Sequence, residues 1–178
     1  MSLHADAVDV VGSWTAPTPD QERLRTAYLE HLATNPDAML RSCQPDHLTA
    51  SAIIVSPDRG RVLLTLHRRL GRWLQTGGHC EPGDASLVAA ATREGIEESG
   101  LNGLKTDPEP VLLSRHEVPC GPLRPAHHLD VQFVAYASGD TRPRISDESD
   151  DVRWFDTDAL PTSADESVRT LVQYAVRR

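Results

Sequence analysis

The hydrophobic residues of this chain follow a helical spacing in two regions, one near the start of the sequence and one at its end. Apolar side chains recur every four residues over 21–32, a spacing that places them on one side of a helix. Residues 168–176 show a similar pattern and predict a terminal helix, and a short helical piece is expected over 36–42. Residues 6–19 lack a regular period and indicate a loose arm or an edge element.

Other segments alternate apolar and polar residues or form short apolar runs, which are the patterns of β-strands. They lie at residues 48–55, 61–67, 111–118, 128–137 and 152–155. A turn at residues 57–60 joins the first two into a hairpin-like pair. These strands lie on both sides of a helix that is predicted within residues 77–101, and the terminal helix follows them. This order predicts an α+β fold in which helices enclose a mixed sheet.

The length of 178 residues fits one domain that can bury a core. We expect residues 1–46 to form a helical N-terminal extension packed on a domain that spans 47–178. The net charge of −8 argues against non-specific binding of nucleic acids, which requires a basic surface. The sequence has no signal peptide, no membrane-spanning apolar run and no CxxC pair. We therefore expect a cytoplasmic protein that does not bind membranes.

The segment that is most informative about function is residues 77–101, GGHCEPGDASLVAAATREGIEESGL. A helix turns about 100° per residue, so Glu94, Glu97 and Glu98 share one face within a single turn. Like charges at this spacing destabilise a helix by roughly 0.2–0.5 kcal/mol, and the helix dipole disfavours anions in the last turn. A divalent cation such as Mg²⁺ reverses this penalty, because it prefers oxygen ligands. The alternative is a solvated acidic helix end.

The residues around this acidic face predict a loop, a helix and a second loop. Asp84 and Ser86 are both suitable N-cap residues, and Gly100 is placed to end the helix. Pro82-Gly83 predicts a turn, and Gly77-Gly78 allows the backbone to approach a ligand closely. The carboxylates are therefore expected beside a glycine-rich turn.

This segment resembles the signature of the Nudix hydrolases, the MutT-like enzymes that act on nucleoside diphosphates linked to another group. The matches are the leading glycine, the R-E pair, the E-E pair and the closing glycine with its aliphatic neighbour: Gly78, Arg93-Glu94, Glu97-Glu98 and Gly100-Leu101. The strict likeness covers residues 78–101, and the flanking pattern extends it to about 47–160. The resemblance implies an α/β/α sandwich with a mixed β-sheet and a central catalytic loop-helix-loop.

Two positions and one spacing depart from the signature. Asp84 stands where the family has glutamate, and eight residues instead of seven separate it from Arg93. Gly95 occupies an aliphatic position, although glycine inside a helix costs about 1 kcal/mol relative to alanine. These departures concern the contribution of Asp84 and the packing beneath Gly95, and they leave the three glutamates intact.

The resemblance implies a hydrolase that uses Mg²⁺, with Mn²⁺ as a substitute, to break a phosphoanhydride bond in a nucleotide-type substrate, and it suggests a homodimer. The residues that it implies as metal ligands are Glu94, Glu97, Glu98, Asp84 and Gly78 through its carbonyl. Catalytic roles are expected for Glu97, for Arg93, which would orient a glutamate through an ion pair, and for Glu148 in a later acidic loop. The alternative for Glu148 is a solvated loop.

Side chains near the signature are candidates for substrate binding. Arg69 precedes the glycine turn and is a candidate phosphate or ribose contact, with a solvated loop charge as the alternative. His79 lies within the signature loop and is a candidate phosphate contact. His127 and His128 point to opposite sides of a strand, so at most one faces a site, and His128 is the candidate. Trp73 is expected in the core rather than stacked on a base.

A zinc site is an alternative use of the histidines and cysteines. The candidates for it are His67, His79, His116, His127, His128, Cys80 and Cys120. No pair among them has a tight ligand spacing such as HxxxH or CxxC, so this alternative is disfavoured. Cys80 is interpreted as a packing residue, because a reactive thiol needs a base and a lowered pKa.

Two other functions compete with hydrolysis. A catalytically silent nucleotide sensor of the same fold would bind without turnover, but binding alone does not need three carboxylates. An isomerase of isoprenoid diphosphates would use a cysteine and a glutamate, but the hydrolase signature is intact. The leaving group stays open among sugar nucleotides, dinucleotides, oxidised nucleoside triphosphates and capped nucleotides, because the signature does not determine it.

Overall fold

The computed structural model of the chain describes residues 1–119, 122–139 and 141–178. Cys120, one of the cysteines in the zinc alternative, lies outside these residues. The strands are β1 (His47–Val55), β2 (Arg61–His67), β3 (Arg72–Leu74), β4 (Thr76–His79), β5 (Lys105–Thr106), β6 (Leu112–Glu117), β7 (His127–Tyr136) and β8 (Ser149–Asp156). The helices are α1 (Leu3–Ser13), α2 (Pro19–Thr34), α3 (Leu87–Ser99) and α4 (Glu166–Ala175).

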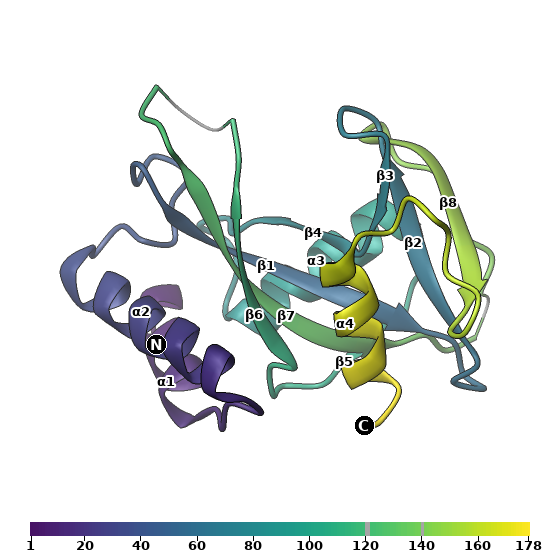
Figure 1. Cartoon of the computed structure of the whole chain (residues 1–178), viewed down its shortest axis with the longest axis horizontal. Coiled ribbons are helices and arrows are strands. Elements are labelled where there is room, and N and C mark those ends of the chain that lie inside the picture. Colours follow the sequence, from purple (N-terminus) through teal and green to yellow (C-terminus); the bar gives the residue numbers. More distant parts are fainter. Residues whose placement is uncertain (120–121, 140) are drawn as a thin grey trace.

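The strands form one mixed sheet with β1 near its centre. β1 pairs in parallel with β7 and antiparallel with β2 and β4. β7 also pairs with β5 and β6, and β2 pairs with β3 and β8. Helix α4 lies in front of the strands and α3 behind them (Figure 1). The predicted α+β sandwich with a mixed sheet is therefore confirmed.

The side chains of β1 alternate between two cores because successive residues of a strand point to opposite faces. Ala52 and Ile54 belong to the cluster that also contains residues of α3. Ile53 and Val55 belong to the cluster that contains the buried residues of α4. Both faces of the central strand are thus covered, which gives β4 and the start of α3 a rigid support. The predicted glycine-rich turn is wrong, because Gly77 and Gly78 lie within β4 and pair with Ser51 and Ala50 of β1.

Helix α3 begins and ends where the sequence predicts. The Ser86 side chain accepts a hydrogen bond from the N–H of Ala89, and Gly100 closes the helix in the left-handed conformation with φ 66°. Gly95 lies on the buried face, where an added Cβ would be 3.0 Å from Leu104 Cδ1. Leu104 therefore occupies the space that an aliphatic residue at position 95 would need, and this packing explains the departure from the signature.

The prediction of a loose arm over residues 6–19 is wrong, because α1 occupies most of this segment. Its Ala7 and Val11 are fully buried, and the Asp6 carboxylate accepts the N–H of Leu87 at 2.8 Å, at the start of α3. The apolar residues of this short helix are not confined to one face, since Val8 is exposed while Ala7 and Val11 are buried, so the sequence shows no clear helical period. The helical piece expected over 36–42 is also wrong, since these residues form turns.

Helix α2 confirms the first predicted helix and packs on the edge of the sheet. Tyr28 is fully buried, and its hydroxyl donates to the Ser114 carbonyl of β6 at 2.8 Å. Among the helices described here, none is long and apolar enough to cross a membrane.

Candidate active site

The three glutamates of α3 differ in exposure although they share one face of the helix. Glu98 is buried with 8% of its surface exposed, Glu94 is half-buried, and the Glu97 side chain is 58% exposed. Glu98 Oε1 accepts the N–H of Gly77 at 3.1 Å, and Glu98 Oε2 accepts the Thr65 hydroxyl at 3.2 Å. These two bonds hold the Glu98 carboxylate against the glycine pair of β4 and against strand β2.

Burial makes the negative charge on this face unfavourable. It raises the pKa of Glu98 to about 7, and the charges of Glu94 and Glu148 add to the effect, while the bonds from Gly77 and Thr65 oppose it. Burial also raises the pKa of Glu94, against the attraction of Arg93. A cation bound between these carboxylates would favour their charged form.

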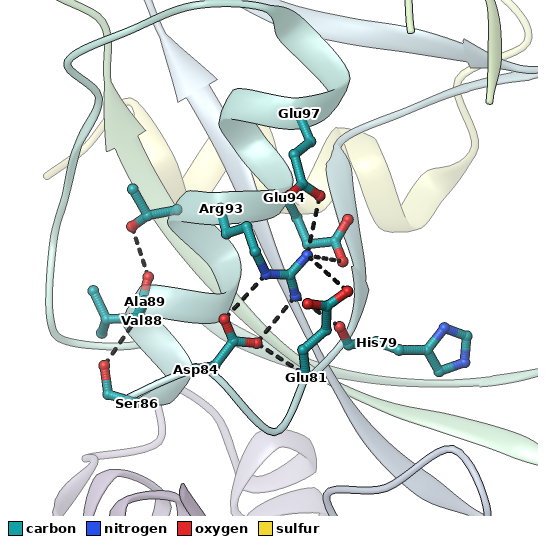
Figure 2. A network of polar contacts seen from close by, with 10 residues as sticks. His79, Glu81, Asp84, Ser86, Val88, Ala89, Arg93, Glu94 and Glu97 are labelled. Carbon is teal, nitrogen blue, oxygen red and sulfur yellow. Dashed lines mark hydrogen bonds and ion pairs between the residues drawn. The ribbon is translucent and has the colours of Figure 1, made fainter. Parts of the chain in front are cut away.

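Arg93 connects the glutamate face to the loop before the helix (Figure 2). Its Nη1 donates to Glu94 Oε1 at 3.0 Å and to Glu97 Oε2 at 3.1 Å. Its Nη2 donates to the His79 carbonyl at 3.0 Å. Although Arg93 projects about 100° away from Glu94 around the helix, its long side chain reaches back to the carboxylates. The guanidinium therefore holds both the glutamates and the last residue of β4, which follows the glycine pair.

Asp84 holds the other side of the same guanidinium. Arg93 Nε and Nη2 donate to its two oxygens, each at 3.0 Å, and the N–H of Glu81 donates to Oδ2 at 2.8 Å. Burial raises the pKa of Asp84, but the bonds from Arg93 and Glu81 outweigh it and leave the pKa below its usual value. Asp84 therefore tethers Arg93 to the loop before the helix, and its predicted role as a metal ligand stays a prediction.

Gly78 lies directly against the Glu94 carboxylate. A Cβ added at position 78 would be 2.7 Å from Glu94 Oε1, which is too close for any real contact. Because the obstacle is the end of a flexible side chain, Glu94 would move and the fold would persist. The leading glycine of the signature is therefore needed for the position of a carboxylate.

We expect Gly78→Ala to lower kcat/KM about 100-fold, the effect of misplacing a reacting group by about 1 Å, with little change in melting temperature. Gly83→Ala is the matched control, because an added Cβ there meets no atom within 4 Å. Steady-state kinetics and thermal unfolding of both variants make the comparison. Equal activity of Gly78→Ala and Gly83→Ala would contradict the role assigned to Gly78.

The remaining candidates lie at different distances from this face. Glu148 is exposed just before β8, and its charge acts on both Glu94 and Glu98, so the fold brings this loop toward the carboxylates. Arg69 is exposed in the turn after β2, where its N–H bonds to His67 Nδ1. Trp73 packs edge-on against Phe155 at a ring distance of 4.8 Å, which agrees with its predicted place at the core.

The histidines form a group of their own. The rings of His79 and His128 lie 4.9 Å apart, and each lies within 5.1 Å of His47, a residue that the sequence patterns did not single out. His127 turns to the other side and bonds to Asp46 at 3.0 Å, so the two neighbouring histidines diverge as predicted. The predicted substrate contacts of His79 and His128 stay predictions.

Cys80 directly follows β4 and is only 6% exposed. Burial raises the pKa of its thiol to about 12, and the surrounding carboxylates add to this effect. Such a thiol is not ionised near neutral pH and is a poor nucleophile. The packing interpretation is supported, and the isomerase alternative loses its cysteine.

Comparisons with known proteins agree with this geometry. A model of the NUDIX domain family matches residues 45–174. A search of curated proteins found no match.

Three solved structures show the same fold at low sequence identity. A NUDIX-family hydrolase from Clostridium perfringens is 23% identical, with a TM-score of 0.62 over 74% of this chain and 96% of that one. A MutT NUDIX hydrolase from Burkholderia pseudomallei is 25% identical, with a TM-score of 0.55 over 72% of this chain and 97% of that one. An Ap4A hydrolase from C. elegans is 17% identical, with a TM-score of 0.60 over 71% of this chain and 93% of that one.

The match to the family model covers well over half of the chain, and it contains the glutamate face, Arg93 and the glycine pair. The chain therefore belongs to the Nudix family of hydrolases, which act on acid anhydrides in nucleoside diphosphate derivatives.

Proposed function

We propose that this protein is a Mg²⁺-dependent hydrolase that cleaves a phosphoanhydride bond in a nucleoside diphosphate linked to another moiety. One observation carries the proposal: a buried and a half-buried carboxylate, Glu98 and Glu94, lie side by side against the glycine pair of β4, and burial raises the pKa of both. Two such groups oppose stability unless a cation binds between them.

The donor set fits the metal that the family implies. Glu94, Glu97 and Glu98 offer only oxygen atoms, and the Gly78 carbonyl is a further oxygen donor. Mg²⁺ prefers such hard ligands and retains water and phosphate oxygens in its coordination sphere, and Mn²⁺ suits the same donors. When bound, the ion would polarise phosphate oxygens and lower the pKa of a coordinated water.

The protein side chains supply position and a proton acceptor. Arg93, tethered by Asp84, would keep Glu94 and Glu97 aimed at the metal and would tie them to the loop after Gly78. The proton of the attacking water would pass to a carboxylate that is not fully committed to the metal, either Glu97 or Glu148. Phosphoryl and nucleotidyl transfer depend mainly on such positioning and on charge neutralisation.

Substrate selection would fall to residues outside the glutamate face. Arg69 is exposed, and within the described residues it bonds to His67 through its backbone N–H, so its side chain can turn toward a phosphate. Solved structures of this fold are named for different substrates, among them Ap4A and ADP-ribose. The fold alone therefore does not determine the leaving group of this protein's substrate. We also propose that residues 1–46 form an extension of a domain that spans 47–178. The protein is further proposed to be a homodimer and to be cytoplasmic.

A substrate panel with Mg²⁺ at mildly alkaline pH tests the proposal. The panel contains sugar nucleotides, dinucleotides including Ap4A, oxidised nucleoside triphosphates and capped nucleotides, with products followed by chromatography. We expect cleavage of at least one compound, loss of cleavage in EDTA and recovery when excess Mg²⁺ is added. Binding of Mg²⁺ and nucleotide without any product across the panel would instead support the silent sensor.

A further inference from the structure

We propose that His47, His79 and His128 form a binding site for a transition-metal ion of the Zn²⁺ class, separate from the glutamate face. One ligand atom from each of these histidines lies within 4.8 Å of the other two. In the described part of the chain, this is the only group of three histidine, cysteine or carboxylate ligands that close together. The glutamates do not form such a group by themselves.

The sheet brings the three residues together from distant parts of the sequence. His47 begins β1 and pairs in register with His128 on β7. His79 ends β4 opposite Thr49, two residues further along β1 and on the same face as His47. Rigid strands therefore supply all three imidazoles, which is the support that a precise metal site needs.

Each imidazole has a buried nitrogen without a partner. The Nε2 atoms of His47, His79 and His128 are buried, and none bonds to a protein atom in the described ranges. His47 itself is fully buried. Leaving a buried polar atom unpaired costs about 1–3 kcal/mol, so three in one place need an explanation, and a shared metal ion provides it.

The protein also presents these nitrogens in the form that binds a metal. His47 Nδ1 lies 3.3 Å from the Cys43 carbonyl, and a ring that donates there keeps a lone pair on Nε2. Metal-binding histidines usually have such a partner. Neutral imidazoles are the binding form.

The donor chemistry selects the ion. Three imidazoles without a carboxylate suit Zn²⁺ and its neighbours rather than Mg²⁺. In a tetrahedral site with Zn–N bonds of about 2.0–2.1 Å, the ligand nitrogens are about 3.4 Å apart, so the rings must rotate inward from their present separation. His116 is not counted as a fourth ligand, because it is exposed and its ring lies 5.5 Å from that of His128. The fourth position of a tetrahedral ion would therefore be open to solvent.

The site adjoins the catalytic loop without overlapping the glutamate face. The backbone carbonyl of His79 accepts from Arg93, while its imidazole points away from the Arg93 network (Figure 2). An ion on His79 would therefore pin the residue after Gly78 to β1 and β7. This role is an alternative to the direct phosphate contacts predicted for His79 and His128.

A metal titration of the full chain without a histidine tag tests the proposal. After removal of metals with a chelator, Co²⁺ is added as a probe, and the visible absorption of tetrahedral Co²⁺ is recorded. We expect one tight equivalent in the wild type and in the double variant Glu94→Gln/Glu98→Gln. We expect an affinity loss above the roughly 10–100-fold effect of removing an outer-shell partner in His47→Gln and in His128→Gln. His67→Gln is the matched control and should bind as the wild type does.

X-ray absorption of the Zn²⁺-loaded wild type guards against a folding defect in the variants. It should show imidazole scattering from three nitrogens at about 2.0–2.1 Å. An oxygen-only shell, wild-type affinity in the His47 and His128 variants, or loss of the tight equivalent in the glutamate variant would each overturn the proposal. Loss of the tight equivalent in the glutamate variant would leave the hydrolase proposal intact. A wild-type protein that binds the ion at the histidines but shows no turnover would contradict the hydrolase proposal and leave the histidine site intact.

Discussion

Glu98→Gln is expected to abolish metal-dependent turnover while the protein stays folded. Glu98 is the most buried of the three glutamates, and the substitution removes its charge without changing its shape. Removing a partner of a metal ligand already costs about 10–100-fold, so loss of a ligand charge should lower kcat/KM at least about 100-fold. Steady-state kinetics at saturating Mg²⁺ measure this effect.

The Glu98→Gln variant is expected to stay folded. A glutamine oxygen can accept the N–H of Gly77, and its amide can donate to Thr65, in place of the two bonds that Glu98 makes. The neutral side chain also avoids the burial penalty that raises the pKa of Glu98 to about 7. In EDTA the melting temperature should therefore equal or exceed that of the wild type.

Glu30→Gln is the matched control for Glu98→Gln. Glu30 is an exposed glutamate in the helix α2, away from the signature, so its variant should keep the activity of the wild type. Wild-type turnover in Glu98→Gln would remove the glutamate face from the mechanism. Loss of folding in Glu98→Gln alone would mean that the carboxylate serves stability.

Local signals made much of the fold and of the catalytic face predictable. The N-cap at Ser86, the end at Gly100 and the spacing of the glutamates all act within one helix, where sequence distance translates directly into geometry. The strands around β1 were likewise visible in apolar runs. Where chemistry depends on neighbours in the chain, the residues themselves are sufficient.

The histidine group shows why the rest was not predictable. His47 and His128 are 81 residues apart, and only the parallel pairing of β1 with β7 places them side by side. The search for HxxxH or CxxC spacing tests ligands on one turn or helix, so it cannot detect ligands on three strands. The pairing of Asp84 with Arg93 was not predictable for a related reason. Helical geometry does not determine where the preceding loop lies, and the long Arg93 side chain reaches back to it.

Arg93→Gln is expected to damage both stability and activity. Arg93 is the bidentate partner of Asp84, whose side chain is 6% exposed, and its own side chain is 21% exposed. Removing one partner of a buried ion pair leaves an uncompensated charge, which should lower the free energy of unfolding by about 3 kcal/mol. Activity should fall about 100-fold, because Glu94 and Glu97 lose the group that aligns them. Urea denaturation and kinetics measure the two effects.

The double variant Arg93→Gln/Asp84→Asn separates these two effects. Asparagine removes the stranded charge, so much of the lost stability should return, as expected for residues that interact directly. Activity should not return, since neither substitution restores a donor to Glu94 and Glu97. Recovery of activity together with stability would show that Arg93 acts only through folding. Recovery of stability alone would establish that the same guanidinium that stabilises the loop also positions the glutamates for the metal.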